Sequence, residues 1–215
     1  VGWLEQQGLI SVLERNLFPQ WNEDERTEIS VKNLLHMSSG LDFDEVYAPG
    51  SDATRMLFMD TVVSGVPLQS ALAEAPGTHF YYSSGTTNLL TLLFNERVGG
   101  PQNALNHLYQ DILWPLGMRH TTLEPDANGV FVGSSNIYAS ARDWARLGQV
   151  FCGKANSMVC GLLTKSICRP QRNPTIVTTA QPTVIRFGSI VVVTSCAGPT
   201  CLPMPMLLPA IEVRS

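Results

Sequence analysis

The sequence lacks long hydrophobic runs and is poor in lysine. No stretch approaches the roughly 18 consecutive apolar residues of a membrane span, so we expect no transmembrane helix. The lysines are Lys32, Lys154 and Lys165, and the net charge is −4. Phosphate neutralisation needs clustered Lys and Arg, which argues against a nucleic-acid partner. The first residues, 1–5, lack an initiator Met and a basic region, so we expect an internal start; compartment and oligomeric state stay open.

Cysteine is missing from residues 1–151, and carboxylates are nearly missing from residues 152–215. The first part holds 17 acidic side chains against 8 basic ones, a net charge of −9, whereas the second holds only Glu212 against 6 basic ones. All five cysteines lie in the second part: Cys152, Cys160, Cys168, Cys196 and Cys201. We therefore expect a partial domain over 1–151 and an unassigned tail over 152–215. A divergent β-rich tail fits this composition, and translation in a wrong reading frame fits it better.

Neither a metal nor a nucleotide is expected. Cys152, Cys160 and Cys168 are spaced eight apart, too wide for a paired zinc knuckle. Residues 148–155 nearly match a phosphate-binding loop, but a helix precedes them and Ala155 has no oxygen to hold magnesium. We expect no cofactor.

Short helices separated by Gly, Pro and Ser dominate residues 1–151. Ser30 is a candidate N-cap for a two-turn helix, and Gly40 suits the left-handed conformation that ends such a turn. The apolar segment 88–98 predicts a buried helix that Gly99 and Gly100 stop.

Three further helices and two strands are predicted less directly. A short helix is expected over 52–60, and another carries Leu105, Leu108 and Ile112 on one face. Ser140 to Asp143 match a capping box, with Trp144, Leu147 and Phe151 following on one helical face. Beyond residue 152 only 175–179 and 184–194 are strand-like.

An aromatic loop precedes the buried helix. The segment 76–85 reads Pro-Gly-Thr-His-Phe-Tyr-Tyr-Ser-Ser-Gly, so a phenol would be held at the start of a helix, near the positive end of its dipole. Taken alone, Tyr81 and Tyr82 are more often a buried aromatic pair than catalytic residues. The order of the neighbouring segments favours the functional interpretation.

Together with residues 29–41, this loop resembles class C β-lactamases, D-alanyl-D-alanine peptidases and related esterases and amidases of the penicillin-recognising superfamily. Supporting segments follow in the same order, at 114–118, 124–126 and 133–148. The acidic segment 42–45 and the Arg-Asp-Trp-Ala-Arg helix look most like the branch that includes 6-aminohexanoate-dimer hydrolases. The resemblance implies an α/β (α+β) fold that pairs a helical region with an antiparallel sheet. This chain would be a mainly α fragment of it, with the sheet largely missing.

The resemblance also implies a mechanism and two catalytic positions. In such enzymes a serine at a helix start attacks the carbonyl of a small-molecule amide, lactam or ester, a lysine three residues later tunes the proton network, and a Tyr-x-Asn or Tyr-x-Ser loop supplies the general base. Carried over, Tyr82 matches the base and Ser84 the third position of its loop.

The partners of this tyrosine are missing. Ile29, Phe151 and Leu162 stand three residues before the lysines, so the chain contains no Ser-x-x-Lys. The resemblance also implies a strand motif, Lys or His followed by Thr or Ser and then Gly, which lines the pocket. This motif is missing too, because Thr122 follows His120-Thr121 where the family has Gly, and Ile167 follows Lys165-Ser166. We expect the nucleophile to lie upstream of Val1 and the chain to be inactive as it stands. A noncatalytic binding or structural module of the same fold is the alternative.

Overall fold

The computed structural model describes residues 1–151, 183–187 and 190–194. The elements in chain order are α1 (Gly2–Gln6), η1 (Pro19–Trp21), η2 (Glu25–Glu28), α2 (Val31–Leu35), α3 (Asp52–Thr54), η3 (Arg55–Met59), α4 (Gly65–Gln69), α5 (Ser84–Arg97), α6 (Pro101–His107), η4 (Leu108–Leu113), β1 (Thr121–Leu123), β2 (Ile137–Ala139), α7 (Ala141–Phe151), β3 (Thr183–Phe187) and β4 (Ile190–Thr194). Elements η1 and η2 are 3-10 helices, and η3 and η4 are π-helices.

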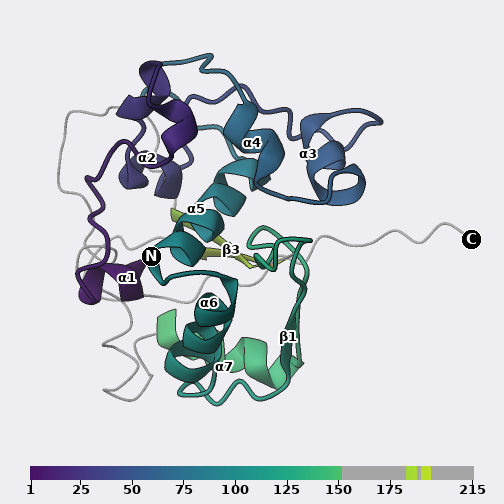
Figure 1. Ribbon diagram of the computed structural model, residues 1–215. Helices are drawn as coiled ribbons and strands as arrows, with labels where there is room; N and C mark the ends of the chain where they lie inside the picture. The colour runs from purple at the N-terminus through teal and green to yellow at the C-terminus, as the bar shows by residue number, and fades with distance from the viewer. Residues whose placement is uncertain (152–182, 188–189, 195–215) are drawn as a thin grey trace, which may run out of the picture.

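Helix α5 is the central element and packs against α2, α4 and α6 (Figure 1). Leu89 and Leu93 on this helix are buried in the largest apolar core. The predicted buried helix is confirmed, but it begins earlier, at Ser84. The cause is an N-cap, because the Ser83 hydroxyl accepts the Thr86 N–H at 3.1 Å.

The capped helix at Ser30 is confirmed but shorter than predicted. Ser30 and Asn33 form a reciprocal capping box, with the Ser30 N–H donating to the Asn33 side chain at 2.9 Å. Helix α2 spans only Val31–Leu35, because Met37 already takes a left-handed conformation with φ 53°. Gly40 is left-handed as expected, with φ 78°, and a Cβ there would lie 2.0 Å from the Glu74 carbonyl oxygen.

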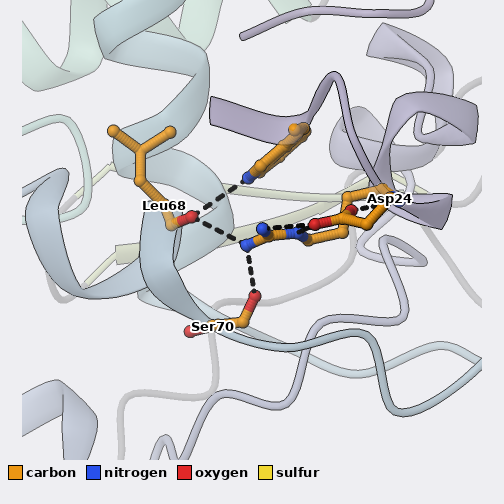
Figure 2. Close-up of polar contacts among 5 residues, drawn as sticks. Asp24, Leu68 and Ser70 are labelled. Carbon is orange, nitrogen blue, oxygen red and sulfur yellow. Dashed lines mark hydrogen bonds and ion pairs between the residues drawn. The ribbon is translucent and has the colours of Figure 1, made fainter. Parts of the chain in front are cut away.

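A polar junction ties the N-terminal segment to the end of α4 (Figure 2). Arg26 donates to the carbonyl oxygens of Leu68 and Ser70, each at 3.0 Å, and its Nε donates to Asp24 at 2.9 Å. The Trp21 indole N–H shares the Leu68 carbonyl at 3.0 Å. One guanidinium thus satisfies carbonyls at a helix end that has no further turn to accept them.

The predicted third helix is confirmed, and its apolar residues are only partly buried. Leu105, Leu108 and Ile112 are half-buried, with Leu108 packed against the cluster that contains the buried Leu113, while Ala104 is buried in the largest core. From Leu108 onward the helix continues as the π-helix η4, whose wider turn shifts the later side chains relative to an α-helical face.

The capping box at α7 forms only by half. The Asp143 N–H donates to the Ser140 hydroxyl at 3.2 Å, but the Asp143 carboxylate accepts the His120 N–H at 2.7 Å and pairs with Arg146 at 2.5 Å. Burial alone would raise the pKa of Asp143, yet hydrogen bonds from His120, Arg146 and Thr121 outweigh it and hold that pKa below its usual value. This carboxylate joins α7 to the start of β1. Trp144 and Leu147 are half-buried beside it.

Two small antiparallel pairs complete the described structure. Strand β1 pairs with β2, and β3 pairs with β4. The predicted strand over 184–194 is therefore a hairpin, whereas 175–179, the cysteines, Lys154 and Lys165 lie outside the described residues. A mainly helical chain with little antiparallel sheet confirms the expected fold class. Among the described residues, no helix is long and apolar enough to cross a membrane.

Candidate active site

The tyrosine loop lies against the turn that follows α2. The Tyr81 N–H donates to the Met37 carbonyl and the Gly77 N–H donates to the Ser38 carbonyl, each at 2.8 Å. Tyr81 is half exposed and Tyr82 is partly buried. The two segments on which the resemblance mainly depends are thus hydrogen-bonded neighbours.

Tyr82 directly precedes the capped start of α5. Ser83 is the buried N-cap, and Ser84, 3% exposed, is the first helical residue. Capping fixes the backbone immediately after the phenol, so Tyr82 is carried by a rigid helix end. The predicted pair, Tyr82 and Ser84, stands on either side of the cap residue.

Glu45 was not among the residues predicted for the site. Its carboxylate accepts two hydrogen bonds from Ser84, from the hydroxyl at 2.5 Å and from the backbone N–H at 2.7 Å. A carboxylate is stabilised at a helix N-terminus, where free N–H groups and the positive dipole end point outward. The acidic segment was a hint, but a contact across 39 residues has no local signal.

The segment that carries Glu45 is anchored on α5 by Phe43. A Cβ on Gly85 would lie 2.7 Å from the Phe43 ring, so glycine allows that ring to cover the first turn of α5. The Glu45 N–H in turn donates to the Tyr81 hydroxyl at 3.4 Å. Residues 43–45 therefore contact both the loop and the helix start.

The segment Gly133-Ser134-Ser135 also contacts α5. Ser134 and the fully buried Asn88 exchange two hydrogen bonds, at 3.1 and 3.2 Å. A Cβ on Gly133 would lie 1.9 Å from the Thr91 hydroxyl oxygen, so the backbone approaches the helix as closely as glycine allows. This segment supports the middle of α5, two turns behind the tyrosine loop.

His120 and Thr121, where the strand motif fails, make contacts that stabilise the fold. Thr121 is buried and donates its hydroxyl to Asp143 at 3.3 Å, while His120 is exposed and uses its N–H for the same carboxylate. The part of the chain that the structure describes contains no cluster of three or more His, Cys, Asp or Glu that could hold a metal. The described site therefore consists of Tyr82 directly before the capped start of α5, with Glu45 and Ser84 hydrogen-bonded beside it.

Comparison with known proteins identifies the family of the chain. The Beta-lactamase family model matches residues 10–175. No curated protein sequence matches the chain.

Several solved structures share the fold. A class C beta-lactamase is 18% identical, with a TM-score of 0.54 over 76% of this chain and 49% of its own. A candidate 6-aminohexanoate-dimer hydrolase from Bacillus anthracis is 18% identical, with a TM-score of 0.63 over 76% of this chain and 47% of its own. A beta-lactamase/D-alanine carboxypeptidase from Yersinia pestis is 22% identical, with a TM-score of 0.56 over 77% of this chain and 52% of its own.

The chain spans about half the length of these structures. The family match covers most of the chain. The chain belongs to the Beta-lactamase family.

Proposed function

We propose that this chain is the tyrosine-loop part of a serine hydrolase that acts through an acyl-enzyme on a small-molecule amide, lactam or ester. The observation that carries the proposal is the placement of Tyr82 immediately before the capped start of α5, against the turn at Met37 and Ser38. A general base must be held within reach of the proton that it takes, and the rigid helix end that carries the Tyr82 phenol supports this role. Neither a cofactor nor a metal takes part.

In this proposal Tyr82 is the general base and Ser84 is the third residue of its motif. A serine hydroxyl is a poor nucleophile until a neighbouring base takes its proton, so the tyrosine needs a serine to act on. The 215 residues contain no Ser-x-x-Lys. Removing a nucleophile leaves at most a small residue of catalysis, and the chain by itself should turn over no substrate.

A turnover assay tests the proposal. The purified chain is incubated with a chromogenic lactam and with a p-nitrophenyl ester, beside an extended protein that carries a Ser-x-x-Lys helix fused ahead of Val1 and a strand with Lys or His, Thr and Gly in place of the tail after Phe151. We expect hydrolysis only by the extended protein, and none when its added serine is replaced by alanine. Turnover by the 215 residues alone would refute the missing-nucleophile assignment.

A noncatalytic binding module of the same fold is the second candidate. It is favoured by the intact start of α5, where Glu45 and Ser84 form a complete hydrogen-bonded pair in a chain that lacks Ser-x-x-Lys. A lactam that raises the unfolding temperature of the chain without being hydrolysed would support this alternative. No hydrolysis by the extended protein, combined with such stabilisation, would make it the better account.

The tail has its own test. We propose that residues 152–215 depart from the domain through a shift of reading frame near codon 152. The surrounding DNA, read in all frames, should then encode a Lys or His followed by Thr and Gly. A frame that contains no such strand motif would favour a divergent tail.

A further inference from the structure

One residue, Glu45, connects the loop and the helix that the proposed mechanism uses, through its carboxylate on Ser84 and its backbone N–H on Tyr81. Glu45 accepts both hydrogen-bond donors of Ser84, with its two oxygens 2.5 Å from the hydroxyl and 2.7 Å from the backbone nitrogen. Its own N–H donates to the Tyr81 hydroxyl at 3.4 Å. Glu45 thereby contacts the residues on both sides of the Tyr82-Ser83 pair.

This contact is built by the surrounding structure. The segment that carries Glu45 is fixed on one side by the buried Phe43 ring on Gly85, and on the other by Asp44, whose N–H donates to the Asp52 carboxylate at 3.0 Å. Charge-assisted hydrogen bonds of this length are stronger than neutral ones. The carboxylate also lies at the positive end of a 14-residue helix.

We propose that Glu45 is a positioning residue that sets the conformation of the tyrosine loop by holding Ser84 and Tyr81. The proposal gives Ser84 a definite part. A serine hydroxyl has one proton to donate, and here it donates that proton to Glu45, so the oxygen can offer only lone pairs to any other group. Ser84 then acts by fixing the helix start, and Tyr82 remains the group that would meet the substrate. The importance of this conformation for catalysis rests on the proposed role of Tyr82. The placement of Ser84 and Tyr81 by Glu45 does not depend on that role.

Fluorine NMR of the full chain, labelled with 3-fluorotyrosine, tests the placement without requiring activity. The chain has five tyrosines, of which Tyr109 and Tyr138 lie on other elements and serve as internal references. The Tyr82 line is assigned with Tyr82→Phe. In Glu45→Ala we expect the Tyr81 and Tyr82 lines to shift or broaden while both reference lines stay in place.

Amide hydrogen exchange gives the second readout. The Ser84 amide should exchange at least about tenfold faster in Glu45→Ala, since it loses a hydrogen bond to a charged acceptor. Glu45→Gln keeps an oxygen that can accept this N–H and should restore part of the protection. Asp44→Asn is the matched control, because it removes the same charge one residue away and keeps the acceptor for Val46.

The outcomes separate the proposal from its rivals. Unchanged Tyr82 and Ser84 signals in Glu45→Ala would overturn it. Movement of all the tyrosine lines together would overturn it too, because the effect would then be on the whole fold. If Asp44→Asn changed these signals as much as Glu45→Ala does, the cause would be the loss of a negative charge and not the loss of the contact with Ser84, which would also overturn the proposal. Failure of the turnover assay, with these signals as expected, would reject the catalytic role of Tyr82 and leave the placement by Glu45 intact.

Discussion

Gly85→Ala is a sharp test of the packing at the start of α5, because two effects on the free energy of unfolding oppose each other. Gly85 has ordinary helical geometry, so alanine should favour the helix by about 1 kcal/mol. An added Cβ, however, would lie 2.7, 2.8 and 3.0 Å from three carbons of the Phe43 ring. Contacts this short must be relieved by moving the ring.

The ring has little room to move. Phe43 is 3% exposed and belongs to a buried cluster with Met56 and Val132. Overpacking of such a core typically costs about 1 to 3 kcal/mol, which exceeds the gain in helix propensity. We therefore expect Gly85→Ala to destabilise the chain by about 1 kcal/mol, which lowers the unfolding temperature by about 2 to 4 °C.

Urea and thermal unfolding of four proteins measure the effect: the parent, Gly85→Ala, Phe43→Leu and the double variant. Phe43→Leu alone should destabilise the chain through lost packing, but it should also make room for the new methyl group. The double variant should then be more stable than the sum of the single changes implies, with a coupling of about 0.5 kcal/mol or more. Stabilisation by Gly85→Ala, or strict additivity, would refute the close contact of Phe43 with α5.

Three further predictions concern other contacts. Arg26→Gln should destabilise the chain by about 2 kcal/mol in urea unfolding, because the guanidinium donates to two carbonyls (Figure 2). Arg15 lies in an exposed ion pair, so Arg15→Gln should change the free energy of unfolding by less than about 0.5 kcal/mol. Equal losses in the two variants would contradict this ranking. Ser30→Ala should cost about 1 kcal/mol in the same assay by removing half of the capping box, and no loss would show that water replaces the cap. Asp143 has a lowered pKa in the folded state, so its contribution to stability is present above the unfolded pKa of about 4 and is lost as the pH falls through the lower folded value. Asp143→Asn should therefore lower the unfolding temperature at neutral pH and approach the parent in acid, and a pH-independent difference would contradict the assignment.

Local chemistry decided which elements could be predicted from the sequence. Ser30 with Asn33, and Gly99 with Gly100, act within one helical turn, and both helix boundaries were confirmed. The change from α-helix to π-helix at Leu108 could not be predicted, because nothing in the local pattern of apolar residues signals it.

The same limit applies to the candidate site. Tyr82 and Ser84 were found through a motif, and their catalytic roles remain predictions. Glu45 was not found, since its contact with Ser84 depends on Phe43 packing against Gly85, which joins segments about 40 residues apart only in the folded chain. The Asp143 carboxylate likewise accepts the His120 N–H and does not complete the predicted capping box with Ser140, because the fold brings β1 to the start of α7.

The most direct test of the proposed catalysis is the acylation rate of the extended protein, with both its Ser-x-x-Lys helix and its Lys/His-Thr-Gly strand in place, compared with that of its Tyr82→Phe variant. Phenylalanine keeps the ring and removes the group that accepts the proton. General-base catalysis contributes about a hundredfold or more, so the rate should fall by at least that factor. An acylation rate near that of the parent would contradict the role of Tyr82 as the base.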